Sequence, residues 1–199
     1  MNTPNKLTVF RILLVPLIVI VSLINTDINI YGIPLTFVIM DIIFIIGSLT
    51  DKLDGYLARK NNQVTNFGKF LDPIADKVLV VSAMLILVGA ERLPSWIPII
   101  VITREFAVSG YRLIAVEQNG KVIAANNWGK LKTVTQMIAI ALAFIDVNSF
   151  GDFFVKNLDI VPFIINLLST SLMIICVIAT LFSGYEYLKN GKDLLKDIK

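Results

Sequence analysis

Residues 51–76 read DKLDGYLARKNNQVTNFGKFLDPIAD and carry four aspartates, Asp51, Asp54, Asp72 and Asp76, between two long apolar stretches. A charged side chain deep in a lipid bilayer costs roughly 3 kcal/mol on insertion scales. Four carboxylates this close together in an apolar chain therefore need an oppositely charged partner. Divalent cations are the simplest one.

The chain around this stretch is unusually apolar, since 56% of its 199 residues are hydrophobic, more than a soluble domain of this length carries. A membrane-spanning helix needs about 20 apolar residues. Six segments meet this requirement: 6–26, 33–58, 69–90, 95–116, 130–147 and 160–187. No small-residue cleavage site follows the first segment, so we expect it to be retained. The sequence predicts an all-α membrane protein, a six-transmembrane-helix bundle that forms a single domain over residues 1–199.

Basic residues are distributed unevenly between the two ends of these segments. Of the 18 lysines and arginines, only Arg92 and Lys156 fall in the loops after the first, third and fifth segments. Basic loops stay on the cytoplasmic side of bacterial membranes. We therefore expect both termini and the loops 59–69 and 117–132 in the cytoplasm, and 148–159 outside. The net charge of +3 reflects this asymmetry and does not indicate nucleic-acid binding.

The composition also limits the chemistry. The sequence contains no histidine and one cysteine, Cys176. Histidine bases, histidine metal ligands and intramolecular disulfides are excluded, and a lone cysteine in an apolar helix is most often a packing residue. Acid–base or metal chemistry must use carboxylates, lysine, tyrosine or water.

The spacing of the aspartates brings each pair onto one helix face. Asp51 and Asp54 are three residues apart, and Asp72 and Asp76 are four apart. The short polar connector 60–66 makes the two helices antiparallel neighbours that meet at their connected ends. Small residues, which let helices or a ligand approach closely, accompany both pairs: Gly55, Ala58 and Gly68.

A site made only of carboxylates selects hard cations such as Mg²⁺, Mn²⁺ or Ca²⁺. Two divalent ions would neutralise four aspartates, and a pair of metal ions is a known device for phosphoryl transfer. A spare carboxylate oxygen could accept a proton from an attacking hydroxyl. The structural alternative is that the aspartates neutralise neighbouring basic residues, namely Lys52, Arg59, Lys69 and Lys77. Four aspartates at fixed spacing beside small residues disfavour it.

The pattern D-x-x-D-G-x-x-A-R-x8-G-x-x-x-D-x-x-x-D resembles the signature of the CDP-alcohol phosphotransferase family. Every fixed position is present: Asp51, Asp54, Gly55, Ala58, Arg59, Gly68, Asp72 and Asp76. The resemblance implies a six-helix membrane enzyme, with a dimer as the family habit. It would transfer a phospho-alcohol group from a CDP-linked donor to an acceptor hydroxyl and release CMP.

The resemblance also implies roles for single residues. Asp51 and Asp72 would bridge two Mg²⁺ or Mn²⁺ ions, while Asp54 and Asp76 would each complete one site. Asp76 would also be the base that deprotonates the acceptor hydroxyl. The CDP-lipid pocket would be lined by Gly55, Ala58, Arg59, Thr65 and Gly68. For Arg59, a helix-end anchor at the membrane interface is the alternative.

Three further stretches are similar to the bacterial phosphatidylglycerophosphate synthase branch of this family. They are NKLTVFR at 5–11, and ITREFAVSGYR at 102–112 together with WGKLKTVTQM at 128–137. This similarity implies CDP-diacylglycerol as donor and sn-glycerol 3-phosphate as acceptor. Inositol phosphate, serine and phosphatidylglycerol remain alternative acceptors. A cation transporter is a rival interpretation, which the lack of an internal repeat and of paired broken helices disfavours.

Residues at the start of the first segment could bind the nucleotide or diphosphate. Asn5, Thr8 and Arg11 lie at its expected cytoplasmic end. The alternatives are that Thr8 is an ordinary helix-start residue and that Arg11 is an interface anchor.

Basic residues inside the later segments also favour a phosphate-bearing acceptor. Arg104 and Arg112 lie about two helical turns apart, near one face, and Lys130 and Lys132 enter the fifth segment. Cations inside a membrane bundle need a counter-anion, and arginine suits phosphate because it can donate two parallel hydrogen bonds. Glycerol 3-phosphate carries such a group, whereas serine does not.

A structural pairing of Arg104 is the alternative, with Glu105 or Asp41 as its partner. Adjacent helix residues point apart, so we expect Glu105 to be a poor direct partner. Asp41 lies in the middle of the second segment. We predict for it a hydrogen bond to a neighbouring helix or a pair with Arg104.

Overall fold

The computed structural model describes residues 3–60, 66–117 and 127–190, and the side chains of 6–50, 74–75, 77–111 and 127–189. These residues form six long α-helices. In chain order they are α1 (Thr3–Ser22), α2 (Leu35–Lys60), α3 (Asn66–Gly89), α4 (Trp96–Glu117), α5 (Asn127–Ile145) and α6 (Ile160–Asn190). Each predicted segment falls largely within one of them.

Two short features were not predicted from the sequence. A β-hairpin precedes α2, in which β1 (Asn29–Ile30) pairs antiparallel with β2 (Ile33–Pro34). Its two-residue turn has positive φ at Tyr31 and Gly32, 51° and 83°, as tight hairpin turns require. A 3₁₀ helix, η1 (Asp152–Phe154), lies between α5 and α6.

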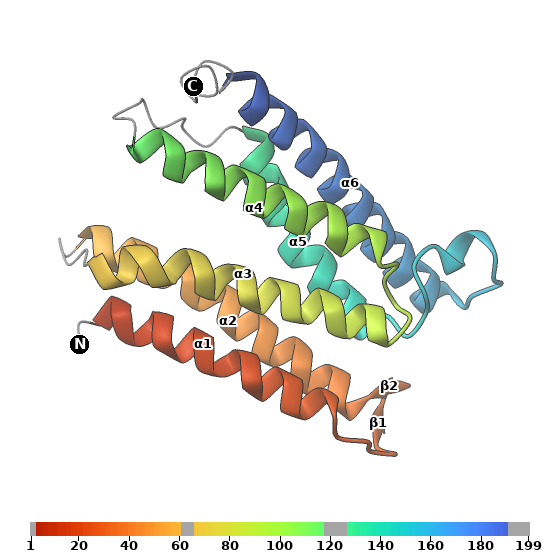
Figure 1. The fold of residues 1–199 in the computed structure, drawn as a ribbon. Coiled ribbons are helices and arrows are strands. Elements are labelled where there is room, and N and C mark those ends of the chain that lie inside the picture. Colours follow the sequence, from red (N-terminus) through yellow and green to blue (C-terminus); the bar gives the residue numbers. More distant parts are fainter. Residues whose placement is uncertain (1–2, 61–65, 118–126, 191–199) are drawn as a thin grey trace.

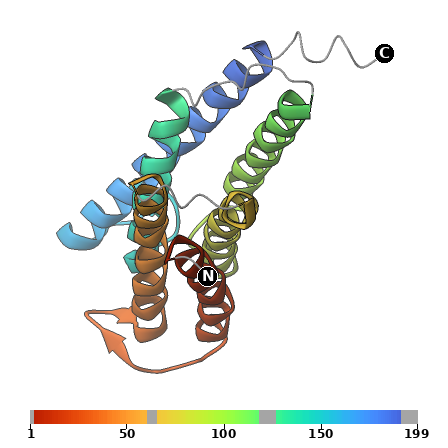
Figure 2. The same ribbon diagram turned by 90° about the vertical axis from the view of Figure 1, so that its left-hand side faces the viewer.

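The helices form two groups that share one core. Helices α1, α2 and α3 pack together, α5 and α4 pack on α6, and α2 against α5 joins the groups. Figure 1 shows that α1, α3 and α5 begin at the same end of the bundle, where α2, α4 and α6 finish. We call this the motif end, because the described parts of the motif, residues 51–60 and 66–76, belong to it. The hairpin and η1 lie at the opposite end (Figures 1 and 2).

All six helices contribute apolar side chains to the core. Its fully buried members include Ile18, Phe44, Leu79, Ile97, Ile140 and Met173. Cys176 is also completely buried among them, as expected for a packing residue.

The outward faces of the helices are apolar as well. Exposed side chains on them include Leu13, Ile42, Leu85, Ile99, Ile138 and Leu181. Among the described residues one helix, Ile160–Lys189, is by itself long and apolar enough to cross a membrane, and shorter apolar stretches occupy Leu35–Thr50 and Lys77–Gly89. Large exposed apolar surfaces of this kind mark contact with lipid or with another protein.

Polar contacts hold α5 and α6 together at the end opposite the motif end. Asp146, only 3% exposed, accepts hydrogen bonds from Asn166 Nδ2 and Ser169 Oγ, both at 2.8 Å, and from the backbone N–H of Asn148 at 3.0 Å. A buried carboxylate is stable only when such donors satisfy it.

Arg92 closes the same end from the α3–α4 hairpin. Its Nη1 donates to the carbonyl oxygen of Phe144 at 2.7 Å, and its guanidinium carbon lies 3.6 Å from the centre of the Phe37 ring. Burial lowers the pKa of Arg92 to about 10, and the nearby charge of Asp146 acts in the opposite direction. The side chain therefore remains a cation at neutral pH.

Candidate active site

The four aspartates lie on two helices that are neighbours in space. Asp51 and Asp54 belong to α2, and Asp72 and Asp76 belong to α3, while their side chains lie outside the described residues. The same holds for the side chains of Asn5, Gly55, Ala58, Arg59, Gly68 and Arg112, and for the whole of Thr65. The local geometry must therefore be built from the residues that flank the motif.

A close contact between α2 and α3 lies at Gly47, next to the motif. A Cβ atom at this position would overlap Cδ2 of Leu79 and would lie 3.3 Å from Cδ1 of Leu14 on α1. Gly47 precedes Asp51 by one helical turn, and Leu79 follows Asp76 by three residues. The absence of a side chain at position 47 thus lets the two motif helices touch immediately beside the aspartates.

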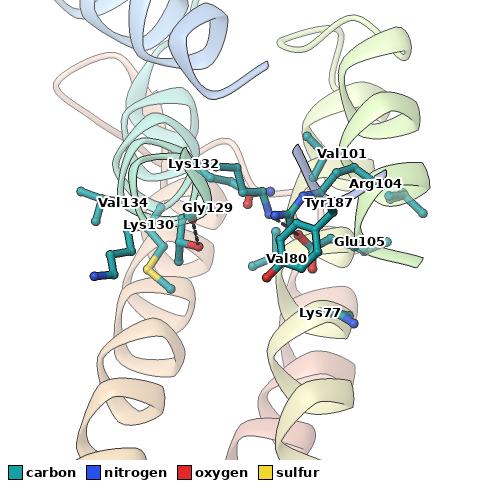
Figure 3. A pocket seen from close by; sticks show the side chains of 15 residues that line it. Lys77, Val80, Val101, Arg104, Glu105, Gly129, Lys130, Lys132, Val134 and Tyr187 are labelled. Carbon is teal, nitrogen blue, oxygen red and sulfur yellow. Dashed lines mark hydrogen bonds and ion pairs between the residues drawn. The ribbon is translucent and has the colours of Figure 1, made fainter. Parts of the chain in front are cut away.

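A cavity of about 430 Å³ opens between α3, α4, α5 and α6 (Figure 3). Its lining includes four cationic side chains and one carboxylate: Lys77, Arg104, Lys130, Lys132 and Glu105. Lys77 directly follows Asp76 on α3, so the cavity adjoins the aspartate motif. A cavity with this excess of positive charge is suited to an anionic ligand.

Glu105 connects two of these cations through a single atom. Arg104 Nη1 and Lys132 Nζ both donate to its Oε1, at 2.8 and 2.7 Å. The prediction that Glu105 is a poor partner for Arg104 is therefore wrong. Both side chains are long enough to bend towards one another, and Lys132 of the neighbouring helix fixes the carboxylate within reach of the guanidinium.

Arg104 is also held by α6. Its Nη2 donates to Ser183 Oγ, and its guanidinium carbon lies 5.7 Å from the centre of the Tyr187 ring. Figure 3 shows Arg104, Glu105, Lys132 and Tyr187 converging in the cavity. The two α6 residues were not predicted, because they lie about 80 positions away in a largely apolar helix.

The remaining predicted acceptor residues are placed differently. Lys130 lines the cavity, but its side chain is exposed and points away from the group around Glu105 (Figure 3). Lys77, which was not predicted to bind the acceptor, donates from Nζ to Ser109 Oγ on α4. Asp41 does not pair with Arg104: its Oδ1 is buried and has no hydrogen-bond partner among the described residues. Neither interaction predicted for Asp41 is therefore found for this atom.

Thr8 and Arg11 lie inside the bundle. They are 1% and 0% exposed and continue the buried stripe of α1 that includes Leu14 and Ile18. Complete burial of the Arg11 guanidinium favours an inward-facing role over that of an interface anchor, because an anchor would extend into the headgroup region.

Comparison with known proteins supports the family assignment that the motif indicates. The sequence model of the family described as CDP-alcohol phosphatidyltransferase matches residues 1–183. The chain belongs to the CDP-alcohol phosphatidyltransferase family. The predicted family resemblance is thereby confirmed.

Bacterial proteins named CDP-diacylglycerol–glycerol-3-phosphate 3-phosphatidyltransferase are similar to the chain over almost its whole length. The Bacillus subtilis protein is 42% identical, over 98% of this chain and 97% of its own. The Haemophilus influenzae protein is 36% identical, over 98% and 96%. The Rickettsia typhi protein is 35% identical, over 96% and 97%.

Proposed function

We propose that this protein transfers the phosphatidyl group of CDP-diacylglycerol to sn-glycerol 3-phosphate, giving phosphatidylglycerophosphate and CMP. The observation that carries the proposal is the cationic cavity beside the aspartate motif, in which Arg104 and Lys132 converge. A phosphate on the acceptor would provide the counter-anion that these buried cations need. The names of the bacterial relatives specify the same donor and acceptor.

The aspartate motif is suited to hold two Mg²⁺ or Mn²⁺ ions, because its donors are carboxylates only. The Gly47–Leu79 contact supports convergence of the four ligands. With a rise of 1.5 Å per residue in antiparallel helices, Asp51 and Asp76 lie roughly 5 Å beyond the contact, and Asp54 and Asp72 roughly 10 Å beyond it. Each aspartate of α2 thus has a counterpart on α3 at a similar height.

The aspartates would divide the two ion sites between them. Asp51, Asp54, Asp72 and Asp76 would provide the carboxylate oxygens that hold the ions. The bound ions would neutralise negative charge on the diphosphate of the donor.

The chain's own residues would perform the transfer. Arg104 and Lys132, with Arg112, would bind the phosphate of glycerol 3-phosphate and aim its 1-hydroxyl at the donor. Lys130, whose side chain points away from the group around Glu105 (Figure 3), would add to the positive charge that attracts the acceptor into the cavity. Asp76 would accept the hydroxyl proton as the oxygen attacks the phosphorus that carries diacylglycerol. The bond from this phosphorus to CMP then breaks, and CMP leaves with the bonding electrons.

The donor headgroup would be held at the motif end of the bundle. The residues proposed for this pocket are Asn5, Thr8, Arg11, Gly55, Ala58, Arg59, Thr65 and Gly68. The burial of Thr8 and Arg11 supports the assignment, because it places their polar side chains inside the bundle and away from its outward face.

We further propose that the whole chain, residues 1–199, is one integral-membrane catalytic domain and forms a homodimer. Its six helices would cross the bacterial cytoplasmic membrane, with the motif end and both termini in the cytoplasm. The apolar outward faces of the helices support this placement, and so does the concentration of lysine and arginine at the motif end.

Acceptor-dependent release of CMP tests the proposed function. Purified protein in detergent, supplied with CDP-diacylglycerol and Mn²⁺, should release CMP with glycerol 3-phosphate and not with serine or inositol phosphate. Release with serine alone would assign another acceptor to the same chemistry. Cation flux in proteoliposomes without any CMP would instead indicate a transporter.

A further inference from the structure

We propose that Glu105 is a positioning residue, whose carboxylate holds the Lys132 ammonium beside the Arg104 guanidinium and so preforms a two-cation site for the phosphate of the acceptor. The inference rests on the proposed function for the identity of that acceptor. It assigns to an acidic residue a role in binding an anionic substrate.

Glu105 Oε1 is shared by both cations, and this brings their nitrogens close together. Arg104 Nη1 and Lys132 Nζ both lie within hydrogen-bond distance of Glu105 Oε1, so the two nitrogens are within about twice that distance of each other. Two cations this close repel, and the repulsion is strong away from bulk water. The carboxylate between them offsets the repulsion and keeps both charges on one side of the cavity.

Arg104 is held in place by more contacts than Lys132. Arg104 is also bonded to Ser183 and lies beside Tyr187. For Lys132, which is only 5% exposed, Glu105 is the one hydrogen-bond acceptor of the ammonium in the part of the chain that the structure describes. Loss of the carboxylate would therefore displace Lys132 and leave Arg104 in place.

Unused donors indicate that the site is prepared for an anion. Nε of Arg104 is buried and has no hydrogen-bond partner among the described residues, which is a costly state for a charged donor. The Lys132 ammonium has three hydrogens and uses one on Glu105. Glu105 thus orients the two cations but uses only some of their N–H donors. The donors that remain suit a phosphate group.

Steady-state kinetics of Glu105→Gln test the role in the full-length protein. Glutamine keeps the shape of the side chain but loses the charge that holds Lys132. We expect KM for glycerol 3-phosphate to rise about 10-fold or more, kcat to stay within about 3-fold, and KM for CDP-diacylglycerol to stay unchanged. Glu91→Gln, the same change in the exposed hairpin before α4, serves as the control and should leave all three values as in the wild type.

A double-mutant cycle tests whether Glu105 acts through Lys132. Lys132→Met should itself raise KM for glycerol 3-phosphate, and adding Glu105→Gln should then change KM little further. Glu105→Asp keeps the negative charge on a shorter side chain, so it should recover part of the loss. If Glu105→Gln fails to fold, Glu105→Asp compared with wild type and Lys132→Met provides the same comparison.

Thermal unfolding with glycerol 3-phosphate, without CDP-diacylglycerol, gives a readout independent of turnover. The ligand should raise the unfolding temperature of the wild type more than that of Glu105→Gln. An unchanged or lower KM for Glu105→Gln, or full additivity with Lys132→Met, would overturn the role of Glu105. A wild type that releases no CMP with glycerol 3-phosphate would instead end the proposed function, and the two failures are thus distinguishable.

Discussion

Gly47 on α2 and Leu79 on α3 are so close that even a methyl group at position 47 would overlap the leucine side chain. Leu79 is fully buried and has little space to move. We expect Gly47→Ala to lower the free energy of unfolding by about 1–3 kcal/mol. It should also lower the rate of CMP release, because α2 and α3 are forced apart beside the aspartates.

A glycine in open space provides the control for this change. A Cβ at Gly89 would meet no atom within 4 Å, so Gly89→Ala should leave both unfolding temperature and turnover close to wild type. Equal unfolding temperatures for the Gly47→Ala and Gly89→Ala variants would contradict the close packing.

Asp76→Asn tests the proposed base. The amide cannot accept the proton of the acceptor hydroxyl, so kcat should fall about 10²- to 10⁴-fold. The unfolding temperature should change little, since the amide has nearly the same size and shape as the carboxylate. Asp27→Asn, in the exposed loop after α1, is the matched control. Retained turnover in Asp76→Asn would show that another group acts as the base.

Metal removal should abolish turnover if the four aspartates act as ligands. We expect EDTA to suppress CMP release at least about 100-fold and excess Mg²⁺ or Mn²⁺ to restore it, since both are hard cations that carboxylates bind. Asp51→Asn in the same titration should require a higher metal concentration for half-maximal activity. CMP release that is indifferent to EDTA would argue against a metal-dependent site.

Arg104→Lys tests the need for a guanidinium in the cavity. A lysine cannot bond Glu105 and Ser183 at the same time and still present a planar pair of donors to a phosphate. We expect KM for glycerol 3-phosphate to rise about 10-fold, with KM for CDP-diacylglycerol unchanged. An equal increase in both values would show that Arg104 serves the donor or the fold as a whole.

Asp146→Asn should lower the stability of the protein without changing its activity. Asparagine keeps one acceptor oxygen but places an amide donor against groups that already donate, so the free energy of unfolding should fall by about 2 kcal/mol. Asp146 lies at the end opposite the cavity, so both KM values should remain as in the wild type. Denaturant unfolding and CMP release on the same preparation measure the two effects.

The helices and the motif could be predicted from the sequence because both are local patterns. The six apolar segments predicted from the sequence each fall largely within one helix, and the aspartate spacing is read within 26 residues. The hairpin turn at Tyr31 and Gly32 escaped prediction because it consists of only a few residues between long segments.

The cavity could be predicted only in part, because its contacts connect distant segments. Arg104 and Lys132 were found as cations that need an anion. Their link through Glu105 was not, since the rule that adjacent helix residues point apart takes no account of a lysine from α5. Ser183 and Tyr187 were missed because polar residues in an apolar helix have many uses, and only tertiary packing places these two beside Arg104.

The contacts around Asp146 and Arg92 limit the routes by which substrates and products could reach or leave the cavity. They fasten α5, α6 and the α3–α4 hairpin together at the end farthest from the cavity. Under the proposed function, soluble acceptor and lipid donor would then reach the cavity from the motif end, and CMP would leave there too. The newly made lipid would then enter the leaflet that supplied the donor, so its appearance in the other leaflet would require a separate flippase.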